Sequence, residues 1–356
     1  MNPYAYDISD ETPILFPVRM QGKWGYIDKS GKLKIQPQFN GASDFSEGLA
    51  RVKVTKKNIS KYGFINASGD AVIEPKYDYA EDFSEDLALI RYGDEHSGKF
   101  GFIDKSGNTV IEPRFEYLGF TKDDAKFVEG LAPVRIDGKI GYINKSGKIA
   151  IRPQFDWGMP FSEGLALIKL NKKCGYIDKN SDYVITPEFK SAQSFVEGLA
   201  AVLVDDMLGG NWGYIDKKGE IVIPPKFYFT KHFSEGLACV NLTTQTPLIN
   251  MLRPFLGFGP PPLPFLYDRC TYIDKTGQRA FKETFDGGFP FSEGLAAVKV
   301  GVWELNYGYI NRSGKYIIRP KFDNALGFSN GLARVMVSDK LGYIDITGKY
   351  IWEPTN

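Results

Sequence analysis

Short apolar runs, rich in β-branched and aromatic residues and separated by polar turns, recur along the whole chain. Trp24–Asp28, Lys32–Gln36 and Leu49–Val54 are such runs, and each is too short for a typical helix. The segment Asp28–Lys32 between the first two predicts a three-residue hairpin loop. In it, the Asp28 side chain would accept a backbone N–H and Gly31 would adopt a left-handed conformation. The pattern therefore predicts antiparallel β-strands.

The block Lys-Trp-Gly-Tyr-Ile-Asp-Lys-Ser-Gly-Lys, which starts at Lys23, is repeated with variations to the end of the chain. Copies follow one another at 34 to 40 residues, except for a step of 58 between Gly213 and Thr271. A fixed period of this length is typical of repeat architectures. We predict nine copies, with these motif positions serving structure: Trp24, Gly25, Gly63, Gly101, Gly141, Gly175, Trp212, Gly213, Gly308 and Gly342.

Each copy also carries a proline six residues after its turn glycine, as Pro37 follows Gly31, and Glu283 stands in this place once. We expect this proline to stop its strand or to mark an edge, because it lacks a backbone donor. A Phe-Ser-Glu-Gly-Leu-Ala segment such as Phe45–Ala50 then leads into the next copy. Its Ser-Glu-Gly reads as a chain reversal that connects consecutive units.

Apolar residues stand at consecutive positions of the proline-containing strand, as at Val72 and Ile73. Successive side chains alternate between faces, so both faces of this strand are expected to be covered. We therefore predict all-β units, each a three-stranded antiparallel sheet, packed face to face into one core. The predicted boundaries are 13–43, 44–81, 82–125, 126–159, 160–193, 194–231, 232–289, 290–326 and 327–354, within a single repeat domain, 13–354.

These blocks resemble the repeats of the bacterial WG-repeat family, also called KWG repeats, over nearly the whole chain. The resemblance implies an all-β repeat protein with an interaction role and brings no reaction with it. Thr271 departs from the motif by replacing the glycine. The tryptophan also varies, since the other copies have Tyr62, Phe100, Ile140, Cys174, Cys270, Tyr307 and Leu341 at that place.

Such units suit either an open curved β-solenoid-like array or a closed β-propeller-like ring. The pattern predicts a first strand at Leu15–Met20 and a last, third strand at Tyr350–Pro354. Neither end then offers a spare strand to the other, so the prediction favours the open array.

Composition narrows the functional classes only a little. Forty-four Lys and Arg against 43 Asp and Glu give a net charge of +1, so no nucleic-acid partner is expected. No secretory signal or membrane span is visible, and Cys174, Cys239 and Cys270 do not form a disulfide framework. A cytoplasmic location is the expectation.

The repeated polar positions are expected to serve structure rather than chemistry. The Asp28 row should cap hairpin loops, and the Glu47 row should make turn contacts or lie on a solvated rim. The Lys23 row should cover apolar neighbours and pair with the glutamates. Cys174 and Cys270, at the tryptophan position, should pack. With only His96 and His232, no metal, cofactor or catalytic residue is predicted.

Function is expected in the loops that precede the glycine-containing strand, where the copies differ most. The longest, Thr243–Asp268, is an apolar, proline-rich insertion that either packs on the array or contacts a partner. The candidate partner-binding residues are Met251, Leu252, Arg253, Phe255, Phe258 and Phe265.

The sequence thus predicts a non-enzymatic scaffold for a protein partner, with self-association as one possibility. A carbohydrate- or polyanion-binding module is the alternative, based on the aromatic and lysine rows. A third hypothesis is an enzyme with a site assembled from loop residues such as Asp94, Glu95, His96 and Glu304.

Overall fold

The structure, a computed structural model, describes residues 14–94, 97–116, 125–204, 211–241, 269–301 and 306–355. Every regular element in these ranges is a β-strand, so the all-β prediction is confirmed. The described strands form nine antiparallel sheets, in which spatial neighbours are also neighbours along the chain. The chain divides into two compact units, Met1–Tyr117 with Thr355–Asn356, and Leu118–Pro354.

The first unit holds three sheets, which follow one another along the chain. They are formed by β1 (Leu15–Met20), β2 (Lys23–Asp28) and β3 (Leu33–Phe39); by β4 (Gly41–Ala42), β5 (Ala50–Lys56), β6 (Ile59–Ile65) and β7 (Ala71–Tyr77); and by β8 (Tyr79–Ala80), β9 (Ala88–Tyr92), β10 (Lys99–Ile103) and β11 (Thr109–Phe115).

The second unit holds the other six described sheets. Their strands are β12 (Leu131–Ile136), β13 (Lys139–Asn144) and β14 (Ile149–Phe155); β15 (Trp157–Ser162), β16 (Leu165–Leu170), β17 (Lys173–Ile177) and β18 (Tyr183–Phe189); β19 (Ser191–Ala192), β20 (Ala200–Val204), β21 (Asn211–Ile215) and β22 (Ile221–Phe227); β23 (Ala238–Asn241) and β24 (Cys270–Ile273); β25 (Gly287–Gly288), β26 (Leu295–Val300), β27 (Asn306–Asn311) and β28 (Tyr316–Phe322); and β29 (Asn324–Ser329), β30 (Leu332–Val337), β31 (Lys340–Asp345) and β32 (Tyr350–Thr355).

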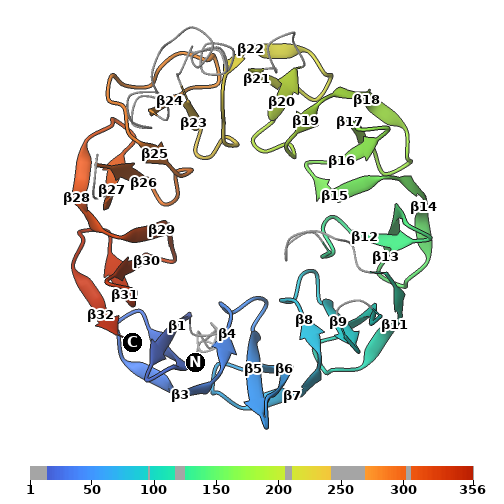
Figure 1. Cartoon of the computed structure of the whole chain (residues 1–356), viewed down its shortest axis with the longest axis vertical. Coiled ribbons are helices and arrows are strands. Elements are labelled where there is room, and N and C mark those ends of the chain that lie inside the picture. Colours follow the sequence, from blue (N-terminus) through green and yellow to red (C-terminus); the bar gives the residue numbers. More distant parts are fainter. Residues whose placement is uncertain are drawn as a thin grey trace, which may run out of the picture. The chain divides into compact units, whose positions relative to one another are not determined.

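Six of the nine described sheets have four strands, and the short first strand pairs with the second. Within the second unit, β15, β19, β25 and β29 are the inner strands of their sheets, and β18, β22, β28 and β32 are the outer ones (Figure 1). Four-stranded antiparallel sheets in this succession are the blades of a β-propeller. The predicted open, solenoid-like array of three-stranded units is therefore wrong, and the propeller alternative describes the fold.

The strand that the sequence prediction missed precedes the Ser-Glu-Gly turn. Trp157–Ser162 forms β15 and pairs with β16, with Phe161 opposite Ala166. Ser-Glu-Gly is therefore a hairpin turn inside a blade rather than a connector between units. In four of the described sheets this inner strand has only two residues, as in Gly41–Ala42, which is too short for a periodic apolar pattern.

The repeat glycine and the proline lie opposite each other at one β-bulge between two paired strands. β3 continues through Pro37 to Phe39, and its register with β2 shifts between the pairs Tyr26–Ile35 and Trp24–Phe39. The proline thus lies in a bulge and does not end the strand, but it does lie on the edge strand of its sheet, which is the second of the two predicted alternatives. A Cβ on Gly25 would lie 2.4 Å from the Ile35 carbonyl oxygen, so only glycine fits opposite this bulge.

The core lies between successive sheets. One buried cluster combines Tyr176 and Ile185 of one sheet with Phe195, Ala200 and Ile215 from the segment that forms the next. The outer strands are covered on one face only: Ile73 is 3% exposed, whereas Val72 is 42% exposed. The expectation that both faces are covered is wrong here, because neighbouring blades diverge toward their outer strands.

Candidate functional site

Within each of the two units, tyrosine and serine side chains at repeated positions join successive sheets. The Tyr176 hydroxyl donates to the Gln193 carbonyl oxygen at 2.7 Å, and the Ser162 hydroxyl donates to the Phe195 carbonyl oxygen at 2.7 Å. The same tyrosine bond is made by Tyr26, Tyr142, Tyr214, Tyr272 and Tyr309, and the same serine bond by Ser46, Ser234 and Ser292. These repeated hydroxyls therefore have a structural role.

The glutamates of the Ser-Glu-Gly turns form a second set of links. Glu163 accepts the backbone N–H of Gly198 at 3.0 Å and lies 3.1 Å from Lys217 Nζ, which also donates to the Glu163 carbonyl oxygen. We call this arrangement the glutamate clamp. Equivalent N–H bonds involve Glu47, Glu129, Glu197, Glu235 and Glu293, and equivalent lysines are Lys105, Lys179 and Lys275. The predicted turn-contact role of this row is confirmed.

The clamp also holds the glutamate backbone in an unusual conformation. Glu163 has a φ of 53° and Gly164 a φ of 88°, which is the left-handed pair of a two-residue hairpin turn. Partial burial alone would raise the pKa of Glu163, but Lys217 and the Gly198 N–H outweigh it and hold the pKa below its usual value. The carboxylate is therefore charged and occupied at neutral pH.

The predicted hairpin caps are present. Asp28 Oδ1 accepts the backbone N–H groups of Ser30 at 2.9 Å and Lys32 at 3.1 Å, and Gly31 has a φ of 83°. Asn144 makes the same pair of bonds to Ser146 and Lys148. Since either side chain offers the required oxygen, the exchange of Asp for Asn along this row needs no ligand to explain it.

A further acidic row escaped the sequence analysis. Asp156 follows β14, and its Oδ2 accepts the N–H of Asn171 in the loop before the glycine-containing strand, while its Oδ1 accepts from Lys139 Nζ at 2.6 Å. Asp78 does the same with Gly93 and Lys61. Lys61 and Lys139 therefore pair with aspartates, not with glutamates as predicted. The signal was the recurrence of Asp or Asn directly after the Pro-x-Phe of the outer strand.

These aspartates fix the edge of the sheets that carries the variable loops, which we call the loop face. Near this edge, in three of the described sheets, a cation on the second strand lies over an aromatic ring at the tryptophan position of the third strand. Lys53 Nζ lies 5.8 Å from the Tyr62 ring centre, and Lys299 Nζ lies 5.8 Å from that of Tyr307. Arg91 lies 5.5 Å from the Phe100 ring in the same way.

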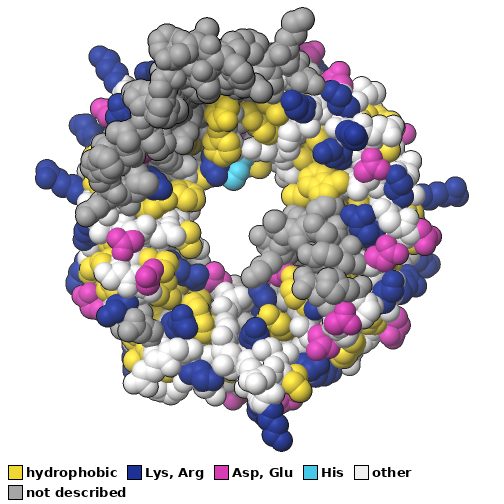
Figure 2. Space-filling view, viewed as in Figure 1, with side chains coloured by type: hydrophobic (Ala, Val, Ile, Leu, Met, Phe, Trp, Pro, Cys, Tyr) yellow, Lys and Arg dark blue, Asp and Glu magenta, His cyan; other side chains and the backbone are white. Residues whose placement is uncertain are grey.

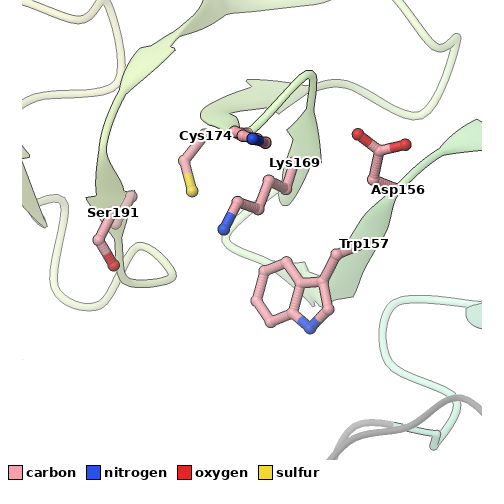
Figure 3. A pocket seen from close by; sticks show the side chains of 7 residues that line it. Asp156, Trp157, Lys169, Cys174 and Ser191 are labelled. Carbon is pink, nitrogen blue, oxygen red and sulfur yellow. The ribbon is translucent and has the colours of Figure 1, made fainter.

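The β15–β18 sheet lacks a ring at this position and contains a pocket. Lys169 occupies the cation position, but its cross-strand neighbour is Cys174 instead of a ring. A pocket of about 420 Å³ opens there, lined by Asp156, Trp157, Lys169, Lys172, Cys174, Ser191 and Ala192. Lys169 extends between Cys174 and Trp157, with Ser191 on the facing strand (Figure 3). The small cysteine leaves the space that Tyr62, Phe100 and Tyr307 fill in their own sheets.

The charges around this pocket are unbalanced. Lys139 and the Asn171 N–H already occupy the Asp156 carboxylate and, with Lys169 nearby, hold its pKa below the usual value. Within the described residues, neither Lys169 nor Lys172 donates a hydrogen bond or forms an ion pair. Burial raises the pKa of the Cys174 thiol, so this side chain is neutral and apolar. The pocket therefore offers cations, an indole ring and an apolar floor.

The predicted residues fall into three groups. Trp24 and Trp212 are half-buried against their core clusters, and the repeat glycines oppose the bulges of the outer strands, so these positions belong to the frame. Cys174 and Cys270 are buried at 5% exposure, which confirms their packing role. The candidate partner-binding residues Met251, Leu252, Arg253, Phe255, Phe258 and Phe265, like the whole Thr243–Asp268 insertion, lie outside the described residues.

No group of three or more His, Cys, Asp or Glu side chains in the described part of the chain is placed to hold a metal ion. No helix that could span a membrane occurs there either. His232 is exposed, and partial desolvation of its imidazole together with Lys231 lowers its pKa. His96, Glu95 and Glu304 lie outside the described ranges.

Solved structures with a similar fold have very different sequences. A eukaryotic initiation factor matches with a TM-score of 0.63 at 10% identity over 95% of each chain. The β-propeller domain of the Trilobed protease from Pyrococcus furiosus matches with a TM-score of 0.42 at 11% identity, over 90% of this chain and 100% of that one. At such identities the first match supports the fold alone, and the second carries no argument.

The sequence comparison is more specific. No curated protein matches the chain. The profile described as "WG containing repeat" matches residues 24–57, 62–95, 100–139, 140–174, 175–207, 212–242, 271–301 and 307–340. These segments contain the glycine, tyrosine, proline and glutamate positions whose contacts build and join the blades. The chain therefore belongs to the WG-repeat family.

Proposed function

We propose that this protein is a non-enzymatic interaction scaffold that binds a protein partner on its loop face. The observation that carries the proposal is that the repeated residues and the variable residues serve different purposes. The repeated side chains are used within the frame, as in the bonds of Tyr176, Ser162 and Glu163 to the next sheet. The loops that differ between blades lie at the loop face, and the pocket beside Trp157 opens there.

A rigid frame with variable loops is a common basis for recognition. Because the frame already holds the loops in place, less conformational entropy is lost when a partner binds. The aspartates support such preorganisation, since Asp78, Asp156, Asp286 and Asp323 each accept a backbone N–H from a loop on this face. The insertion Thr243–Asp268, between β23 and β24, remains a second proposed contact on the basis of its apolar sequence.

The polyanion alternative has less support. Lys61 and Lys139, two members of the lysine row on which it was based, are paired with Asp78 and Asp156. On the face seen in Figure 2, basic and acidic side chains of the described residues are interspersed. A polyanion is held best by aligned cations without neutralising neighbours.

The test is a quantitative pull-down with the full-length protein as bait. We expect the partners to be lost or strongly reduced when Thr243–Asp268 is deleted or when Lys172 on the loop face is replaced by glutamate. A Val184→Glu variant serves as the matched control, because Val184 is 42% exposed on the outer strand of the blade that contains the pocket. If both altered proteins retain every partner, the proposal is wrong.

A further inference from the structure

The pocket beside Trp157 differs from the equivalent places in other blades in a way that indicates its ligand. In the β25–β28 sheet, the Lys299 ammonium lies over Tyr307. In the β4–β7 sheet, Lys53 lies over Tyr62. Lys169 is at the equivalent place, paired in register with Cys174. Cysteine in place of the aromatic residue found in those two sheets thus opens the pocket and leaves the ammonium without a ring on the third strand.

The other walls add to this asymmetry. Trp157 lies across from Lys169 on the adjacent inner strand and packs its indole partly against the core. Lys172, in the neighbouring loop, is exposed and lines the same space. Both acceptor oxygens of Asp156 are already engaged by Lys139 and Asn171. The pocket therefore has cationic donors and an apolar surface to offer, and little free acceptor capacity beyond Ser191.

Resting on the proposed function, we propose that this pocket binds an acidic peptide segment of the partner. A carboxylate pairs with Lys169 and Lys172, and an adjacent apolar side chain lies on the Trp157 indole above Cys174. A partly enclosed ammonium beside an aromatic ring favours a charged acceptor, since charge-assisted hydrogen bonds are about twice as strong as neutral ones. A neutral sugar fits less well, because its hydroxyl donors require acceptors that the engaged Asp156 does not supply.

The experiment uses a random-peptide phage library selected on the immobilised full-length protein. We expect enriched peptides with Asp or Glu next to an aromatic or aliphatic residue. Their affinity should fall about tenfold or more in Lys169→Glu, because attraction becomes repulsion at the carboxylate. Lys299→Glu is the matched control and should bind the selected peptides like wild type, since it changes the same charge at the equivalent position of another blade.

A second variant removes the pocket without changing the charge. Cys174→Tyr reproduces the lysine–tyrosine arrangement of Lys299 and Tyr307, so it should keep the fold while filling the space and abolishing peptide binding. Far-ultraviolet circular dichroism and thermal melting check the fold of each variant. Retained binding by folded Cys174→Tyr would overturn the assignment of the ligand to this pocket.

Other outcomes are equally decisive. Enrichment of basic or uncharged peptides, or of the same peptides by Lys169→Glu, contradicts the proposal. Binding of uronic- or sialic-acid oligosaccharides on a glycan array, lost in Lys169→Glu, would assign the pocket to sugars instead. Failure here with a partner still captured in the pull-down would leave the scaffold function standing and place its contact elsewhere.

Discussion

The Thr271 hydroxyl donates a hydrogen bond to the Glu283 carbonyl oxygen at 3.1 Å. These two residues replace the glycine and the proline that face each other across the bulge in the other repeats. A threonine side chain cannot fit where a Cβ on Gly213 would lie 2.6 Å from the Ile223 carbonyl oxygen. The chain after β24 accordingly departs from the regular outer strand, and the described part of this sheet contains two strands.

Replacing Thr271 by valine tests this bond. Thr271 is fully buried, and valine keeps its shape while removing the donor. We expect a loss of about 1 kcal/mol in the free energy of unfolding, because the Glu283 carbonyl oxygen loses its hydrogen-bond donor. Urea unfolding measures the change, with Thr109→Val on an exposed strand position as the control. Equal stability of the two variants would show that the hydroxyl has no structural role.

The bulge predicts unequal responses at equivalent glycines. A Cβ on Gly141 would lie 2.6 Å from the Ile151 carbonyl oxygen, whereas on Gly342 it would lie 3.1 Å from the Trp352 carbonyl oxygen. Gly141→Ala should therefore cost about 3 kcal/mol through backbone displacement, and Gly342→Ala clearly less. Chemical denaturation of both variants checks the order. Similar costs would mean that the close approach does not explain the glycine.

The glutamate clamp is tested by replacing Glu163 with asparagine. Asparagine adopts a positive φ more readily, and Asn330 occupies the equivalent turn with a φ of 54°. The variant nevertheless loses the bonds to Gly198 and Lys217. We expect a net destabilisation of about 1 kcal/mol in thermal or urea unfolding, since the lost bonds exceed the gain in turn propensity. A more stable variant would contradict the importance of the clamp.

Acid should weaken the same clamp. Burial opposes ionisation of Glu129, but the Gly164 N–H and Lys179 outweigh it and hold its pKa below the usual 4.5. A carboxylate whose pKa is lowered by folding stabilises the protein above its unfolded pKa, and this contribution disappears as pH falls through the lower folded value.

Melting temperatures of wild type and Glu129→Gln, measured from pH 7 to pH 3, follow this loss. We expect wild type to be more stable at pH 7 and the difference to shrink below pH 4.5, the usual value for glutamate. A difference that is constant across this range would mean that the ionised Glu129 makes no specific contribution.

Much of the blade could be predicted from sequence because its signals are local. The Asp28 hairpin caps, the strand ranges around Leu15–Met20 and Trp24–Asp28, and the turn role of the glutamates depend on residues close together in the chain. The inner strand could not be predicted, because β4 and β19 contain only two residues each. Without it each predicted unit had three strands and no strand to close a ring, so the prediction favoured an open array.

The pocket was missed for a related reason. Cys174 was identified as a packing residue, which is correct, but the consequence of its small size depends on its neighbours Trp157 and Lys169 across two strand pairs. Likewise, the row that includes Asp156 acts on a loop 15 residues away, and only the sheet register brings the two together. Such relationships belong to the packed structure and leave only weak traces in a single sequence.

Site-specific photo-cross-linking in intact cells tests the central claim, partner binding on the loop face, most directly. Benzoylphenylalanine would replace Lys172 at the pocket or, in a control protein, Val184 on the outer strand of the same blade. The account predicts a discrete cross-linked protein from position 172 that is lost on adding Lys169→Glu, and none from position 184. Cross-linking from position 184 alone, or from neither position, would contradict it.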